Sequence, residues 1–177
     1  NQSWQPTEGY LTSFFQSLPL IQDSSSIINT YSANLWNEIS ENAIGSLKFQ
    51  AKSVHGVDEN VRLTNRLFVS GNQLRGFVRG KVGPKDGENW IGGNYVMGLS
   101  AEVQLPNLLP ESYKTDFSLH FDSANIWGVD YNDSIEDSNK IRSSIGVAAN
   151  VFTPIGPLSW TLSQSISKAS TDVTETF

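Results

Sequence analysis

Apolar and polar residues alternate one for one along stretches of about ten residues, and this pattern constrains the fold more than any other feature. In residues 115–125 the apolar set is Phe117, Leu119 and Phe121, and the residues between them are polar or titratable. Successive side chains of a β-strand point to opposite faces, so the pattern predicts strands with one apolar and one polar face. The same rule holds in three other stretches, residues 94–105, 141–153 and 158–168.

Three earlier stretches are also β-prone, residues 10–18, 27–36 and 43–54. A last strand begins at Val173 and stops at Phe177, short of the ~9–11 residues that a tilted strand needs to cross a bilayer. We therefore expect about eight strands, seven of them full and the eighth truncated.

A soluble β-sandwich also alternates, but strands of 10–13 residues exceed the usual length of ~5–6. The polar faces carry charges and a run of serines in residues 159–167, as a water-filled lumen would. Aromatic residues gather near strand ends, as they do in interfacial girdles. These features favour an all-β chain that forms a segment of a transmembrane, antiparallel, up-and-down β-barrel.

The connections between the expected strands fall into two classes. Residues 37–42, 106–112 and 153–157 are short and rich in Pro, Asn and Gly, whereas residues 128–140 form a medium loop. A much longer loop, at about residues 55–93, is extracellular in this reading. It holds eight of the chain's fourteen glycines, which are Gly56, Gly71, Gly76, Gly80, Gly83, Gly87, Gly92 and Gly93. So many glycines predict a compactly folded loop with close backbone approaches.

Composition excludes several classes of function. No stretch approaches the ~20 apolar residues of a spanning helix, and the net charge of −6 argues against nucleic acid as a partner. The chain has no cysteine and two histidines, so we expect no disulfide, no metal site and no cofactor. The sequence shows no signal peptide, and we expect a fragment or a mature piece of a larger protein.

Arg75 lies at the centre of the long loop, between Gly71 and Gly76. The polar faces of the two strands that follow offer Glu102 and Asp122, and a guanidinium suits bidentate pairing with carboxylates. The three side chains could therefore pin the loop to the barrel wall. A solvated Arg75 that fixes nothing is the open alternative.

Five ordered motifs at compatible spacing resemble a known family. They are Pro6-Thr7-Glu8-Gly9, then Arg75-Gly76-Phe77 with Gly83-Pro84, then Gly92-Gly93-Asn94 with Ser100 and Glu102, then the stretch from His120 to Trp127, and Pro154-Ile155-Gly156-Pro157-Leu158. Together they resemble BamA, the family of bacterial outer-membrane protein assembly factors, in the surface-antigen superfamily. The resemblance covers most of residues 1–177 and implies the C-terminal part of the family's barrel. The first half of that barrel and the periplasmic POTRA domains are absent from this chain.

The resemblance implies roles for particular residues. Arg75, Gly76 and Phe77 correspond to the family's loop motif, Asp122 corresponds to the partner of the loop arginine, and Gly92-Gly93-Asn94 corresponds to a supporting motif. Two positions depart from the family pattern: His120 replaces a usual Phe, and Ala124 replaces a usual Gly. The packing of this strand on the loop is therefore expected to differ from that of the family.

The resemblance also implies a function in the bacterial outer membrane, where the family folds and inserts other β-barrel proteins. The implied partners are unfolded outer-membrane β-barrel proteins, the lipid bilayer and periplasmic lipoproteins of an assembly complex. A two-partner secretion or autotransporter-assembly transporter of the same superfamily remains an alternative, as does a passive porin.

We expect no enzyme and no catalytic residue. His120 and Asp122 invite comparison with a Ser-His-Asp triad, but they stand two apart on one strand, roughly 7 Å between Cα atoms. No serine lies in a recognisable nucleophile context.

Overall fold

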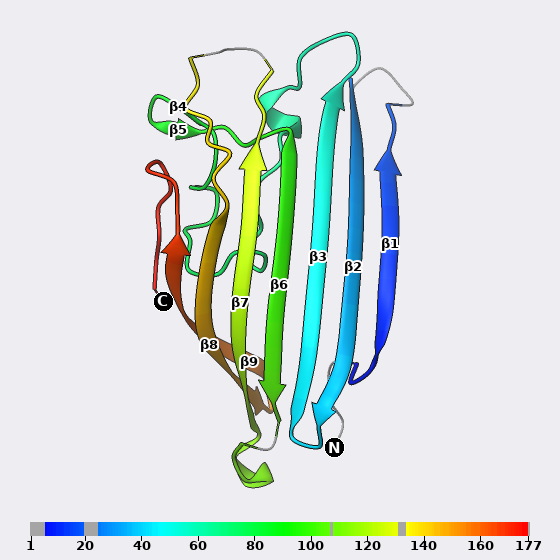
Figure 1. The fold of residues 1–177 in the computed structure, drawn as a ribbon, viewed down its shortest axis with the longest axis vertical. Coiled ribbons are helices and arrows are strands. Elements are labelled where there is room, and N and C mark those ends of the chain that lie inside the picture. The colour runs from blue at the N-terminus through cyan, green and yellow to red at the C-terminus, as the bar shows by residue number, and fades with distance from the viewer. Residues whose placement is uncertain (1–5, 20–24, 107, 131–133, 177) are drawn as a thin grey trace.

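The computed structural model describes residues 6–19, 25–106, 108–130 and 134–176, and it shows one antiparallel sheet with a long excursion of the chain on its inner side (Figure 1). The sheet has seven strands in the order β1-β2-β3-β6-β7-β8-β9. Their bounds are β1 Gly9–Ser17, β2 Ser26–Ser40, β3 Ala43–Gly56, β6 Tyr95–Leu105, β7 Thr115–Trp127, β8 Arg142–Thr153 and β9 Gly156–Ser167. The seven full strands predicted from the sequence, four by alternation and three as β-prone stretches, are confirmed.

Small elements interrupt the connections. The long loop carries a 3₁₀ turn, η1 (Leu63–Asn65), and a two-stranded hairpin of β4 (Lys85–Asp86) and β5 (Asn89–Trp90). A second 3₁₀ turn, η2 (Glu111–Tyr113), lies between β6 and β7. None of the described residues belongs to a helix that is both long and apolar enough to span a bilayer.

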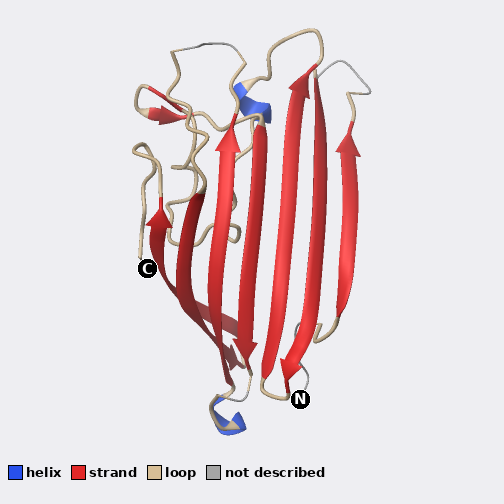
Figure 2. Cartoon of the chain, in the orientation of Figure 1, coloured by secondary structure: helices blue, strands red, loops and turns tan. Residues whose placement is uncertain are grey.

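The two ends of the sheet differ in their connections, as predicted (Figure 2). At one end β2 and β3 are joined by residues 41–42, and β8 and β9 by residues 154–155. The long connection 57–94 and the connection 128–141 leave the opposite end. Residue 107 of the expected turn 106–112 and residues 131–133 of the expected loop 128–140 lie outside the described residues.

The two faces of the sheet are separated as the period-two pattern requires. The outer face exposes large apolar side chains, for instance Leu119 and Phe121 on β7 and Ile145 and Val147 on β8. Their inward neighbours are polar and buried, among them His120 and Asp122. An apolar outer face and a polar inner face are what a barrel wall in lipid needs.

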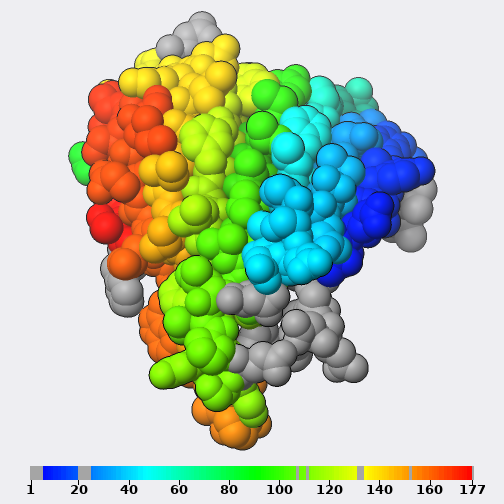
Figure 3. Space-filling model, turned by 60° about the horizontal axis from the view of Figure 1, so that its bottom comes forward, coloured from blue at the N-terminus to red at the C-terminus, as the bar shows by residue number. Residues whose placement is uncertain are grey.

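The sheet curves but does not close within this chain. β1 and β9 are its two edges, and Figure 3 shows the N-terminal strands and the C-terminal segment on opposite sides of the molecule. The chain therefore forms an open, curved part of a barrel wall.

The expected eighth strand differs from the prediction. Residues 173–176 make one backbone hydrogen bond to β9, from Ser163 N–H to the Thr176 carbonyl at 3.1 Å. The only regular pairing described for this segment is the antiparallel bridge between Thr174 and Phe77 of the long loop. The loop offers backbone partners nearby, so the segment pairs with the loop as well as with the strand edge. Phe177, the expected end of this strand, lies outside the described residues.

Candidate functional site

The loop between β3 and β6 closes on itself before it enters the concave side of the sheet. Leu67 and Gly93 exchange both backbone hydrogen bonds, at 2.9 and 3.0 Å. Gly92 has φ +71°, and a Cβ there would stand 2.5 Å from the Leu67 carbonyl oxygen, so this close approach requires glycine. Residues 67–93 thus form one closed excursion with its own neck.

Arg75, near the tip of this excursion, places its guanidinium against the inner face of β6 and β7. Its Nε donates to Asp122 Oδ2 at 2.7 Å, and one terminal nitrogen donates to Oδ1 of the same carboxylate at 2.8 Å. The other terminal nitrogen donates to Glu102 Oε2 at 3.0 Å. Arg75 therefore forms a bidentate pair with one carboxylate and a second ion pair with the other.

The sheet register creates the acceptor group. Asp122 on β7 lies directly opposite Ser100 on β6, and Glu102 lies opposite His120. The Ser100 hydroxyl donates to Asp122 Oδ1 at 2.6 Å, and the backbone N–H of Arg75 donates to Oδ2 at 3.1 Å. Four donors therefore satisfy the fully buried Asp122 carboxylate, whose side chain has 0% exposure.

The two carboxylates keep the Arg75 guanidinium charged. Burial alone would lower the pKa of the Arg75 guanidinium, but the hydrogen bonds and negative charges of Asp122 and Glu102 outweigh it and raise that pKa. Arg75 is therefore a permanent cation between two carboxylates. A buried carboxylate that lost this cation would be left uncompensated, which is costly.

Gly76 and Phe77 complete the loop motif. Gly76 has φ +86°, and a Cβ there would lie 3.0 Å from Ser163 Cβ on β9. Phe77 is 4% exposed and points into an apolar cluster. In this motif Arg75 pairs with carboxylates of β6 and β7, Gly76 permits close approach to β9, and Phe77 packs in the apolar cluster.

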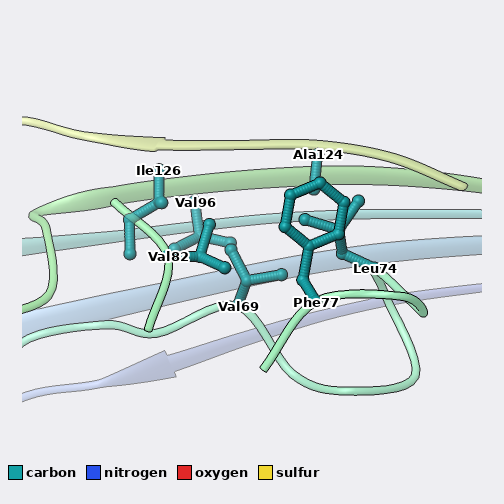
Figure 4. Close-up of a cluster of buried hydrophobic side chains, with 7 residues drawn as sticks. All are labelled: Val69, Leu74, Phe77, Val82, Val96, Ala124 and Ile126. Atoms are coloured by element: carbon teal, nitrogen blue, oxygen red, sulfur yellow. The ribbon is translucent and has the colours of Figure 1, made fainter. Parts of the chain in front are cut away.

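The apolar cluster joins the loop to the wall and was not predicted from the sequence. Figure 4 shows the loop side chains facing those of β6 and β7, and the members are Val69, Leu74, Phe77, Val82, Val96, Ala124 and Ile126. One signal could have revealed it: Val96, Ala124 and Ile126 are apolar at inward strand positions, where polar residues are expected. At 3% exposure, Ala124 fits closely beneath the loop.

The supporting motif lies apart from Arg75. Gly93 passes close to β7, since a Cβ there would stand 2.6 Å from the Trp127 carbonyl oxygen. Asn94 N–H donates to the Gly128 carbonyl at 2.8 Å, and its own carbonyl accepts from Val54 N–H. Gly92-Gly93-Asn94 therefore shapes the neck of the loop, where its described contacts are with Leu67, β3 and the end of β7.

His120 occupies a buried niche beside the site. Its Nε2 lies 2.9 Å from the Ser163 hydroxyl, and a Cβ at Gly146 would stand 2.7 Å from the imidazole ring, so glycine makes room for it. His120 Nδ1 has no hydrogen-bond partner among the described residues. The carboxylate that would orient a catalytic histidine is therefore not in place there.

A separate ion pair, Arg66 with Asp130, joins the base of the long loop to the connection between β7 and β8. The Arg66 guanidinium, whose side chain is fully buried, donates to Asp130 Oδ1 at 2.7 Å, and Val61 N–H donates to Asp130 Oδ2 at 2.9 Å. Burial alone would raise the pKa of Asp130. The backbone hydrogen bond from Val61, further hydrogen bonds and the charge of Arg66 outweigh that effect and lower the pKa. Sequence reasoning missed this pair because its members come from two different connections.

Metal binding finds no support in the described part of the chain, where no three His, Asp or Glu side chains gather. The arrangement is a set of anchors that dock a loop, and its chemistry is electrostatic and steric.

Comparisons with known proteins agree with the motifs. Residues 1–177 match the model of the Omp85 superfamily domain. An outer membrane protein assembly factor BamA from Neorickettsia risticii is 32% identical over 122 residues, which cover 67% of this chain and 16% of that protein. The resemblance read from the sequence is thereby confirmed.

The fold has a similar counterpart among solved structures. The crystal structure of BamA from Haemophilus ducreyi lacking POTRA domains 1–3 superposes with a TM-score of 0.83 at 22% identity. The match covers 99% of this chain and 38% of that one. The chain thus spans well under half the length of these proteins.

Proposed function

The chain belongs to the Omp85 superfamily and is part of a bacterial outer-membrane β-barrel, and we propose that it helps to fold and insert other β-barrel proteins into that membrane. Unfolded β-barrel proteins are the substrates in this proposal. The lipid bilayer and periplasmic lipoproteins of an assembly complex are the other partners. No covalent chemistry is required.

The proposed mechanism is templating at a strand edge. An exposed edge offers unpaired N–H and C=O groups to an incoming strand, and main-chain hydrogen bonds guide its addition. In lipid each unpaired backbone group costs several kcal/mol, so an edge that opens must be metastable. The remaining wall must then be rigid, or the barrel would lose its shape when the edge opens.

The docked loop is the observation that carries the proposal. Arg75 binds Asp122 on β7 and Glu102 on β6, and Phe77 packs on the same two strands. Gly76 meets β9, so a single short segment touches three of the four C-terminal strands. In this proposal the loop braces the wall next to the edge that opens.

A passive porin is the second candidate. Its lumen would have to stay open to solutes, but here the loop fills the concave side of β6 and β7 with an apolar cluster and buried charges. A secretion or assembly transporter of the same superfamily would use the same brace. Steady conductance in planar bilayers would favour the porin, and export of a soluble substrate would favour the transporter.

The test is Arg75→Ala in the intact protein. The substitution leaves the buried Asp122 carboxylate without its cation, and we expect a loss of about 3–5 kcal/mol of stability. Heat resistance of the folded barrel on gels and insertion of a β-barrel substrate into lipid vesicles should both fall.

The matched control is Arg62→Ala in the same loop. Arg62 pairs with Glu59 at 2.9 Å, but both side chains are largely exposed, so little change is expected. Unchanged heat resistance of the Arg75→Ala barrel would refute the bracing role. Normal substrate insertion by a destabilised barrel would refute its link to assembly.

A further inference from the structure

A second buried carboxylate, Asp172, lies in the segment that follows β9. Its side chain has 0% exposure and faces Arg142 of β8, which is equally buried. Arg142 Nε donates to Asp172 Oδ2 at 2.9 Å, and a terminal nitrogen donates to Oδ1 at 3.2 Å. This is a second bidentate Arg–Asp pair, separate from that of Arg75.

The Asp172 carboxylate also accepts two backbone donors from different parts of the chain. Gly83 N–H in the long loop donates to Oδ1 at 3.1 Å. Ala169 N–H, at the turn after β9, donates to Oδ2 at 2.6 Å. One carboxylate therefore joins the loop, β8 and the segment that leaves β9.

Arg142 extends this network to β7 and the connection after it. Its remaining terminal nitrogen donates to Asn125 Oδ1 at 2.6 Å and to the Ser138 carbonyl at 3.2 Å. Arg142 is the largest fully buried side chain among the described residues. Asp172 compensates the charge of Arg142, so removal of either residue would leave the other as an uncompensated buried charge.

Backbone hydrogen bonds continue the contact beyond Asp172. Val78 N–H donates to the Val173 carbonyl at 2.9 Å, and Val173 N–H donates to the Lys81 carbonyl at 3.0 Å. Glu175 N–H donates to the Gly76 carbonyl at 3.1 Å. Residues 76–83 of the loop therefore run beside residues 172–175, from the Arg75 site to the Asp172 site.

We propose that Asp172 is a positioning residue that fixes the segment leaving β9 against the docked loop. The loop then determines the course of the chain along the edge of β9, where Thr176 accepts from Ser163 N–H. The link to assembly rests on the proposed function, because edge templating requires that this edge be held in register. The positional claim itself does not depend on it.

The experiment places nitroxide labels on Glu88→Cys and Glu175→Cys in the intact protein, whose described part contains no cysteine. Glu88 is 97% exposed at the side chain and Glu175 is exposed, so neither label disturbs the core. We expect one narrow distance distribution in the parent protein. Asp172→Asn replaces an acceptor oxygen with an amide donor that faces other donors, so the distribution should broaden at least twofold.

Glu59→Gln is the control, since it removes a carboxylate from the exposed pair with Arg62 and should leave the distribution narrow. A folded Asp172→Asn barrel with an unchanged narrow distribution would overturn the proposal. If Asp172→Asn prevents folding, Arg142→Met with Asp172→Leu removes both charges while keeping the volume filled. That pair should fold and still show the broad distribution, because the acceptor for Gly83 and Ala169 is gone.

Hydrogen exchange of the unaltered protein gives a measurement that needs no variant. The amides of Gly83 and Ala169 both donate to the Asp172 carboxylate, so both should exchange at least about tenfold more slowly than the same amides in an unstructured chain. Less than about tenfold protection of the Ala169 amide would overturn the proposal. Substrate insertion by the unaltered protein is scored separately, so a protein that keeps this segment fixed but inserts no substrate refutes only the proposed function.

Discussion

The inner faces of β6–β9 and of β1–β3 follow the same alternation but have different surroundings. On β6, Ser100 is 8% exposed and bonds both to Arg75 and to Asp122. On β2, the hydroxyl of Ser32 bonds to that of Ser13, at 2.7 Å on an exposed surface. The loop covers the first region and reaches the second at β3, where Gln73 donates to Gln50 at 2.7 Å, but it leaves the Ser13–Ser32 pair exposed.

The one-for-one alternation along a strand therefore determines the face to which a side chain points but not whether that side chain is buried. Under the loop, inward polar residues form buried ion pairs, and the Ser100 hydroxyl donates to a buried carboxylate, so the loss of these contacts is costly. On β1 and β2, by contrast, the inward hydroxyls of Ser13 and Ser32 form a neutral, exposed pair, which contributes little. Substitutions under the loop should therefore cost more stability than the same substitutions at exposed positions.

The largest effect is expected for Phe77→Ala. Phe77 is 4% exposed inside the cluster between loop and wall, and its removal should leave a cavity that costs about 3–5 kcal/mol. Urea unfolding of the intact protein in lipid vesicles measures the change. Phe14→Ala on the outer face of β1, where Phe14 is 65% exposed, leaves no cavity and should cost clearly less. Equal losses would remove the distinction between the two regions.

Gly83→Ala should rank second. A Cβ there would meet Ile126 Cγ2 at 2.5 Å, and φ is +102°, so overpacking of about 1–3 kcal/mol adds to the backbone strain. Gly80→Ala is the control, because Gly80 also has positive φ but has nothing within 4 Å. The difference between their unfolding midpoints isolates the close approach of loop and wall. No difference would mean that the loop can shift away from β7 at little cost.

Ser100→Ala against Ser32→Ala compares the same change on the same face of neighbouring parts of the sheet. Loss of the Ser100 hydroxyl removes a donor to a buried carboxylate, and we expect about 1.5–3 kcal/mol. Loss of the Ser32 hydroxyl should cost about 0.5–1 kcal/mol, a neutral hydrogen bond on an open face. The unfolding free energies of the two variants decide whether the loop makes the inner faces different.

The smallest effect is expected for Asp130→Asn and depends on pH. The pKa of Asp130 is lowered in the folded protein, so its contribution to stability is fully present above the ordinary aspartate pKa of about 3.9. The contribution is lost as the pH falls through the lower folded pKa. Asn keeps an oxygen that can accept from the buried Arg66 guanidinium, and the carboxylate is itself 30% exposed, so we expect the loss of its charge to cost about 1 kcal/mol at pH 7, shrinking towards pH 3. A difference between variant and parent that does not change with pH would exclude the charge of Asp130 as its origin.

The strands and their connections could be predicted closely because both signals are local. Alternation over residues 115–125 requires only that neighbours along the chain point to opposite faces, and the structure extends this strand by two residues to Trp127. The eighth strand was less predictable. Residues 173–176 have partners on the loop as well as on β9, and the choice between them depends on residues about a hundred positions away.

The site could be predicted in part. The motif and the resemblance pointed to Arg75, Glu102 and Asp122, and the structure places these side chains in contact, while their role in assembly stays a prediction. The apolar cluster, the Arg66–Asp130 pair and the Arg142–Asp172 pair were missed. Each joins residues from separate elements, and no local pattern marks such a pair.

By itself, the sequence determined a lipid-facing sheet with polar inner faces, its two unlike ends, and a compact glycine-rich loop, because periodicity and glycine content act over short range. Only the tertiary structure decided which inward residues are buried and what compensates their charges. The physical reason is that alternation gives Asp122 and Lys48 the same direction, and only the docked loop gives Asp122 a cation and removes its water.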